Sequence, residues 1–291
     1  MRDQSKTLIS AAFQKKLRRK VIQPNAVKTG FHSGKRKSRS AGQSLDFADF
    51  REYHPGDDVR QMDWNVYART NKHYIKQFLD QRELSVVLYL DASLSMAHDA
   101  EKWLRLKQIA GALGCVSLLG EDRFSLIPVG SSTRPWLLKK GGGHAANLLS
   151  YLEGVESSQQ TFAEGLAKTT LPKTSLSIVC SDFLEPVEPM LHALRKLHHR
   201  SDVWLLQLLS SSEVTPAYDG DVRLIDVETS NDVQVSMHER IIRKYEQKLK
   251  DHSGTLQQFA LQRGMGWLSV STDMSVEQIV LEAMVKQGWV K

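Results

Sequence analysis

From residue 85 onward, short apolar runs alternate with longer amphipathic stretches, and this alternation constrains the fold more than any other feature. The apolar runs have the length of strands, and the stretches between them carry apolar residues at helical spacing. The predicted strands cover residues 85–90, 124–129, 176–180, 203–209 and 266–270, and the predicted helices cover residues 102–119, 144–153, 162–169, 187–198 and 238–263. Such an alternation is typical of a mostly parallel sheet with helices on both faces. We therefore predict a doubly wound, Rossmann-like α/β fold.

Two parts of the chain depart from this alternation. Residues 222–227 alternate apolar and polar side chains and residues 232–235 follow a polar turn, which predicts an antiparallel hairpin at an edge of the sheet. Residues 45–84 are polar and aromatic, with a turn signal at 53–58 and a predicted strand at 74–79. The predicted organisation is a basic N-terminal arm (1–43), a compact segment (44–84) and an α/β domain (85–291).

Several sequence features indicate where such a chain resides. No apolar run approaches the roughly 18 to 20 residues needed to cross a bilayer. The apolar stretch at residues 7–13 is too short for a signal peptide, and basic residues follow it at once. Cys115 and Cys180 lie in separate apolar stretches, which predicts buried free thiols in a reducing compartment. We expect a soluble, cytoplasmic protein.

The net charge of +6 is distributed unevenly. Residues 1–43 hold twelve Lys or Arg and one acid, a balance of +11, whereas the rest of the chain carries −5. Within this arm we predict a basic helix at residues 7–21, which ends before Pro24, and then a loop. The arm predicts contact with nucleic acid, an anionic membrane surface or an acidic protein, although a solvated terminus explains it equally well. Nucleic-acid binding through residues 15–20 and 35–39 is therefore an alternative function.

Oxygen-bearing side chains gather where an open parallel sheet binds its ligands, at the carboxyl ends of its strands. Asp91, Ser93 and Ser95 follow the first predicted strand, Asp182 ends another, and Thr161 precedes a predicted helix. Asp and Ser are also common helix caps and turn residues, so an isolated Asp-x-Ser-x-Ser motif is a weak signal. Carboxylate and hydroxyl oxygens are hard ligands that suit Mg²⁺ or Mn²⁺. We predict that these five residues hold one such ion.

The same five residues resemble the metal-ion-dependent adhesion site (MIDAS) of von Willebrand factor A domains. The resemblance implies that the hydroxyls coordinate the ion, that the acids bind it directly or through water, and that a vacant position accepts a partner's carboxylate. Neither a catalytic triad nor a nucleotide-binding loop is recognisable in the sequence. A metal-assisted phosphoesterase would need more carboxylates and is the weaker alternative. We therefore expect a binding protein and not an enzyme.

A second resemblance covers more of the chain, about residues 30–287, and is to the bacterial domain-of-unknown-function family 58. The motifs that carry it are Asp46-Phe47, Arg51-Glu52-Tyr53, Pro55-Gly56-Asp57-Asp58-Val59-Arg60, Met62-Asp63-Trp64, Ala68-Arg69-Thr70 and Asp91-Ala92-Ser93-Leu94-Ser95-Met96, together with residues 226–229 and 245–273. Gln159 and Gln160 stand where the family often has Gly. The resemblance implies a von Willebrand factor A-like domain in a short, soluble member. It also implies a protein partner, a MoxR-type AAA+ ATPase, in the assembly or maturation of a client protein.

The family motif around Pro55-Gly56 has a physical reading of its own. Pro-Gly predicts a tight turn, and the two acids that follow can pair with nearby arginines. The acids are Asp57 and Asp58, and the arginines are Arg51, Arg60 and Arg69. We expect this turn to be structural and Trp64 to be a packing anchor, with a partner-binding surface as the alternative.

Overall fold

The computed structural model describes residues 8–24, 47–55, 57, 59, 62–78, 84–170, 172, 174–216, 220–225, 232–237 and 239–291. The chain divides into two compact units. The smaller unit is Phe31–Glu83, and the main unit combines Met1–Gly30 with Leu84–Lys291.

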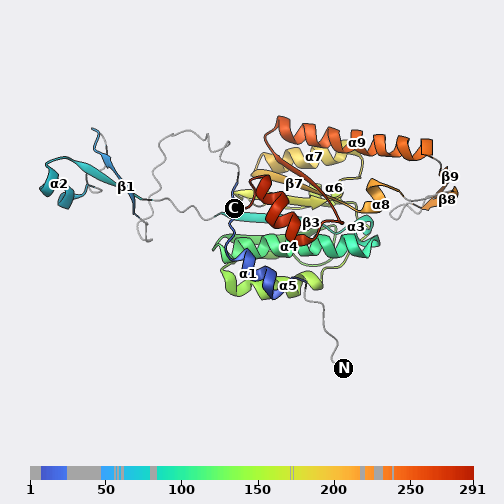
Figure 1. Cartoon of the computed structure of the whole chain (residues 1–291), viewed down its shortest axis with the longest axis horizontal. Helices are drawn as coiled ribbons and strands as arrows, with labels where there is room; N and C mark the ends of the chain where they lie inside the picture. The colour runs from blue at the N-terminus through green and yellow to red at the C-terminus, as the bar shows by residue number, and fades with distance from the viewer. Residues whose placement is uncertain are drawn as a thin grey trace, which may run out of the picture. The chain divides into compact units, whose positions relative to one another are not determined.

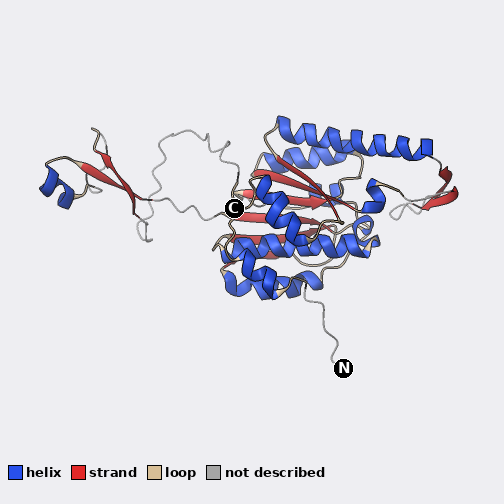
Figure 2. Ribbon diagram, viewed as in Figure 1, coloured by secondary structure: helices blue, strands red, loops and turns tan. Residues whose placement is uncertain are grey.

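The main unit is built on a six-stranded sheet, drawn in red in Figure 2. Its strand order is β10 (Gly266–Ser271), β7 (Asp202–Leu209), β6 (Leu176–Ser181), β3 (Ser85–Asp91), β4 (Arg123–Val129) and β5 (Trp136–Lys140). All neighbours pair in parallel except β4 and β5. The chain runs from β3 outward to β4 and β5, then returns to the other side of β3 with β6. The carboxyl ends of β3 and β6 therefore flank the point where strand order reverses.

Helices cover both faces of this sheet, as Figure 1 shows. One face carries α4 (Ala100–Leu119), α5 (Ala145–Glu153) and a C-terminal helical segment of α10 (Val276–Gln278), the π-helical turn η4 (Ile279–Ala283) and α11 (Met284–Lys286). The other face carries α6 (Phe162–Lys168), α7 (Val187–His198) and α9 (Glu239–Gln262). Alternate residues of β3 enter the two cores, with Leu88 in one and Tyr89 in the other. The predicted doubly wound α/β fold is confirmed, with every predicted strand of the sheet present.

The edges of the sheet differ from expectation. The predicted hairpin exists as β8 (Gly220–Ile225) and β9 (Asp232–Met237), but these strands form an antiparallel sheet of their own. The antiparallel edge strand is instead β5, whose side chains are half-buried or exposed and whose three apolar residues, Trp136 to Leu138, are too few to mark a strand in the sequence. Two short helices, α3 (Leu94–His98) and α8 (Ser211–Val214), follow the ends of β3 and β7. They are too short to show helical periodicity.

Part of the basic N-terminal stretch belongs to the main unit. Helix α1 (Ala11–Leu17) is shorter than predicted and packs against α4, with Phe13 and Leu17 buried. Beyond it, the backbones of Val21 and Lys291 exchange hydrogen bonds of 3.1 and 3.0 Å. Residues 8–24 are therefore core-forming, and the basic residues 35–39 lie outside the described part of the chain.

The smaller unit pairs β1 (Phe47–Glu52) with β2 (Tyr74–Phe78) in an antiparallel ribbon and includes α2 (Trp64–Thr70). Asp63 caps α2 by accepting from the backbone N–H groups of Asn65 and Val66 at 2.8 and 3.1 Å. The expected arginine–acid pair forms between Arg51 and Asp57, at 2.9 Å, and lowers the pKa of Asp57. The expectation for Trp64 is wrong, because 61% of its surface is exposed.

Two further expectations concern the thiols and the membrane. Cys115 and Cys180 are buried and free. Throughout the described residues, every helix is too short or too polar to cross a bilayer.

Two helical glycines test how tightly α4 is packed. A Cβ at Gly114 would lie 2.2 Å from Leu148 Cδ2 and 2.8 Å from Phe124 Cε1, whereas a Cβ at Gly254 in α9 meets nothing within 4 Å. Gly114→Ala should therefore lower the free energy of unfolding by about 1–3 kcal/mol through overpacking. Gly254→Ala should raise it by about 0.5–1 kcal/mol through helix propensity alone. Urea unfolding of both variants measures the difference, and an unchanged or raised stability of Gly114→Ala would contradict the packing of α4.

Candidate metal centre

Two buried acids stand side by side at the switch point of the sheet. Asp91 is the last residue of β3, Asp182 directly follows β6, and the two strands pair with Leu90 opposite Cys180. The exposed fractions of Asp91 and Asp182 are only 1% and 3%. Parallel pairing therefore brings together two carboxylates that are 91 residues apart in the sequence.

Asp91, Ser93 and Ser95 form one hydrogen-bonded group. The hydroxyl of Ser93 donates to Asp91 Oδ1 at 2.7 Å and lies 2.9 Å from the hydroxyl oxygen of Ser95. Ser93 occupies the N-cap position of α3, yet its side chain makes no capping hydrogen bond. The motif is therefore more than a helix cap, since the Ser93 hydroxyl turns toward the carboxylate. Adjacent ligands of an octahedral Mg²⁺ at about 2.1 Å lie about 3 Å apart, which these oxygen spacings match.

Thr161 lies on a loop that is attached to the same turn. Ser158, three residues before it, donates its backbone N–H to the carbonyl of Ala92 at 2.9 Å. Thr161 is the N-cap residue of α6, but its side chain makes no capping hydrogen bond. The carboxylate of Glu185 instead accepts hydrogen bonds from the N–H groups of Phe162 and Ala163. The Thr161 hydroxyl is thus not used by its own helix.

The loop at Gln159 and Gln160 packs against a glycine from another segment. Gly130 follows β4 with a φ of +83°, and a Cβ there would lie 3.0 Å from the carbonyl oxygen of Gln160. The close backbone approach beside Thr161 therefore depends on Gly130.

The fifth predicted residue, Asp182, is held by an unexpected partner. Lys102 on α4 is fully buried, and its Nζ lies 2.7 Å from Asp182 Oδ2 and 2.6 Å from Glu213 Oε1. Burial lowers the pKa of Lys102, but Asp182 and Glu213 outweigh that effect and raise it overall. The ammonium group therefore stays charged inside the protein.

The charge balance of the site favours a further cation. Burial and the neighbouring Asp182 raise the pKa of Asp91 to about 7, against hydrogen bonds from Ser181 and Ser93 that lower it. With all groups ionised, Asp91, Asp182 and Glu213 carry three negative charges, and Lys102, which pairs with the last two, carries one positive charge. The two negative charges left over equal the charge of one divalent ion.

The donor set fits a hard cation held largely by hydroxyl oxygens. Within the described ranges, no three His, Cys, Asp or Glu side chains are grouped so as to hold a metal. An ion here would therefore use Ser93, Ser95 and Thr161 together with Asp91 and Asp182, as hard oxygen ligands for Mg²⁺ or Mn²⁺.

The sequence did not single out four side chains that shape this site. Lys102 and Glu213 form the ion pairs, Ser181 donates to Asp91 Oδ2 at 2.5 Å, and Glu185 caps α6. Only Ser181 carries a local signal, because it directly precedes Asp182. The others reach the site from α4, α8 and the loop after β6, through contacts that sequence spacing does not encode.

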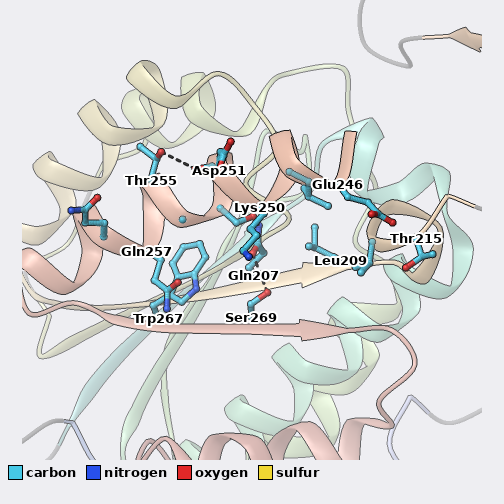
Figure 3. Close-up of a pocket in the computed structure, with 15 residues that line it drawn as sticks. Gln207, Leu209, Thr215, Glu246, Lys250, Asp251, Thr255, Gln257, Trp267 and Ser269 are labelled. Atoms are coloured by element: carbon cyan, nitrogen blue, oxygen red, sulfur yellow. Dashed lines mark hydrogen bonds between the residues drawn. The ribbon is translucent and has the colours of Figure 1, made fainter. Parts of the chain in front are cut away.

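A groove of about 930 Å³ lies between α9 and strands β7 and β10 (Figure 3). The side-chain amide of buried Gln207 donates to the carbonyl of Asp182 at 2.9 Å and to the hydroxyl of Ser253 on α9 at 3.0 Å. Val214 and Thr215, at the end of α8, also line the groove. One side chain therefore connects the groove to the backbone of the candidate site.

The family model described as "Protein of unknown function DUF58" matches residues 49–255, a span that includes all five candidate ligands. This chain belongs to the DUF58 family. Among the curated proteins similar to it are Uncharacterized protein Rv1480 of Mycobacterium tuberculosis (strain ATCC 25618 / H37Rv) and Uncharacterized protein Mb1516 of Mycobacterium bovis. Each is 28% identical over 190 residues, which are 62% of this chain and 59% of the relative. The chain thus spans about 59% of the length of these curated relatives.

Solved structures with some likeness include BatB from Bacteroides thetaiotaomicron, a conserved hypothetical protein, at 13% identity and a TM-score of 0.37, covering 70% of this chain and 98% of that one. A von Willebrand factor type A protein from Catenulispora acidiphila has 14% identity and a TM-score of 0.35, covering 46% and 34% of the two chains. Because both TM-scores are below 0.5, the fold assignment rests on the strand order itself.

The raised pKa of Asp91 predicts how stability depends on pH in a chelator. An acid whose pKa is raised by folding makes the folded state less stable as pH increases, here between about 4 and about 7. Asp91→Asn removes this cost and should raise the free energy of unfolding at pH 7.5, by up to about 4 kcal/mol, with little change near pH 4.5. Urea unfolding at both pH values measures it. A loss of stability of equal size at both would show that Asp91 is not destabilised by its charge.

Proposed function

We propose that this DUF58 protein is a metal-dependent protein-interaction module. Mg²⁺ or Mn²⁺ at Asp91, Ser93, Ser95, Thr161 and Asp182 would supply a positive centre that binds a carboxylate of the partner. The observation that carries the proposal is the orientation of the Ser93 hydroxyl, which bonds to the Asp91 carboxylate and lies beside the Ser95 hydroxyl instead of capping α3.

The composition of the site supports binding by an external acid. Hydroxyl ligands are neutral, so an ion held mainly by them retains positive charge that carboxylate-rich cages would cancel. The Ser93 hydroxyl bonds to the Asp91 carboxylate and to the Ser95 hydroxyl, not to an imidazole base, which supports binding over acyl transfer. We therefore propose a binding role and no catalytic role.

For the partner, we propose a MoxR-type AAA+ ATPase, with assembly or maturation of a client protein as the shared task. Membership of the DUF58 family supports this choice, because the resemblance of residues 44–96 implies such a partner. An acidic side chain on the ATPase or on the client would occupy the free position of the ion.

Metal binding can be measured directly by calorimetry with Mg²⁺ and Mn²⁺. We expect one ion per chain, and Ser95→Ala should weaken binding by about 10- to 100-fold or more, since even the loss of an outer-shell partner costs that much. Ser131→Ala is the matched control, because Ser131 follows the neighbouring strand β4 but bonds to Thr133 and the carbonyl of Glu156. Absence of binding heat in the unaltered protein, folded and freed of metal beforehand, would remove the metal from the proposal.

Partner binding is tested by capture from the native cell. The tagged full chain should retain the AAA+ ATPase in Mg²⁺ buffer and lose it in EDTA, and Asp91→Asn should fail to retain it in either. Ser131→Ala should behave like the unaltered chain. Retention of the ATPase by all three proteins in EDTA would mean that the interaction does not use this site.

A further inference from the structure

Lys102 places a positive charge in this site, and a bound metal cation would repel it. Its fully buried Nζ bridges Asp182 Oδ2 and Glu213 Oε1. We propose that Lys102 is an internal cation that competes with the divalent ion for Asp182, sets the affinity of the site for metal, and shifts onto Glu213 when metal binds. This inference rests on the proposed function, and it assigns the regulation of the same site.

The competition follows from the way Asp182 is already engaged. Its Oδ2 accepts from Lys102 at 2.7 Å, and its Oδ1 accepts from the backbone N–H of Leu184 at 3.0 Å. A divalent ion between Asp91 and Asp182 would draw on the same carboxylate and would repel the ammonium beside it. In a buried site this repulsion is weakly screened, so each cation lowers the affinity of the carboxylate for the other.

Glu213 is built to receive Lys102. Its Oε2 accepts from the N–H of Ser210 at 2.8 Å in a capping box at the start of α8, which leaves Oε1 for Lys102 at 2.6 Å. The side chain of Glu213 is 26% exposed, so its charge costs less to hold than that of a fully buried acid. Its carbonyl also accepts from the Tyr245 hydroxyl of α9 at 2.9 Å. Because Glu213 belongs to α8, a closer Lys102–Glu213 pair would stabilise α8.

Another buried lysine on the same helix shows what a purely structural lysine looks like here. Lys107 Nζ donates to the carbonyls of Val155 and Glu153 at 2.8 and 3.3 Å and lies 4.6 Å from the centre of the Trp103 ring. These backbone carbonyls are neutral, and they lie at the end of α5, not at the metal centre. Lys107 is therefore a matched control for the loss of a buried positive charge from α4.

The test is Mg²⁺ calorimetry at one pH on the full chain and four variants. Lys102→Met should bind Mg²⁺ at least about tenfold more tightly, because a nearby positive charge is removed. Glu213→Gln should bind more weakly, because Lys102 then depends on Asp182 alone. In the double variant Lys102→Met/Glu213→Gln, the effect of the glutamine should largely disappear, which distinguishes competition through Lys102 from a general loss of negative charge. Lys107→Met should leave the affinity unchanged.

The double variant also guards against misfolding. Lys102→Met alone leaves buried carboxylates without their cation, which destabilises the fold. The double variant removes one positive and one negative charge and so keeps the balance. If Lys102→Met does not fold by itself, the double variant should still bind Mg²⁺ at least about tenfold more tightly than Glu213→Gln does.

Hydrogen exchange gives a readout that does not depend on affinity. Adding Mg²⁺ should slow amide exchange in α8, at Ser211–Val214, in the unaltered chain and in Lys107→Met. The same addition should have no effect on α8 in Lys102→Met, because the link through Glu213 is gone.

The outcomes separate this inference from the proposed function. Tighter binding by Lys102→Met supports the inference, and unchanged or weaker binding by a folded Lys102→Met overturns it while the proposed metal site stands. Binding by Lys102→Met alone would support the competition and overturn metal dependence of the natural protein. No binding by any variant would overturn both.

Discussion

Two buried carboxylates at the ends of adjacent parallel strands repel each other, and the rest of the site is arranged around that repulsion. Asp91 and Asp182 cannot move apart, because β3 and β6 are paired along their length and covered by helices on both faces. Their charge must therefore be balanced where they stand. Protonation of Asp91, hydrogen bonds from Ser93 and Ser181, and the ammonium of Lys102 each supply part of that balance. A divalent ion would supply the remainder, and this need is the physical basis of the proposed function.

The same balance explains why the site extends beyond the motif that marks it. Lys102 enters from α4, whose close approach to β4 depends on the absence of a side chain at Gly114. Glu213 enters from α8, and Gln207 ties the backbone of Asp182 to α9 beside the groove. Asp182 is thus connected through Lys102 to α4 and α8 and through Gln207 to α9. A partner carboxylate that binds the ion would therefore affect α4, α8 and α9 through Asp182.

The smaller unit illustrates a limit of reading residue types alone. Trp64 is a large aromatic residue in a family motif, and aromatic residues of that size are usually buried. The ribbon of β1 and β2 and the short α2 offer little surface to cover it, so its ring stays exposed. The turn beside it does follow the chemistry of its residues, because Arg51 and Asp57 pair at short range. Local charge pairing was predictable there, and burial was not.

The sequence by itself determined the doubly wound sheet, its five parallel strands and the placement of Asp91 and Asp182 at strand ends. These features follow from apolar periodicity, which depends only on neighbours along the chain. Only the tertiary structure decided that β5 forms the edge, that α1 joins the core and that the β8–β9 hairpin stands apart. It also decided which cation faces Asp182. Lys102 and Glu213 are 111 residues apart, and a contact over that distance depends on how α4 and α8 pack, which no local pattern records.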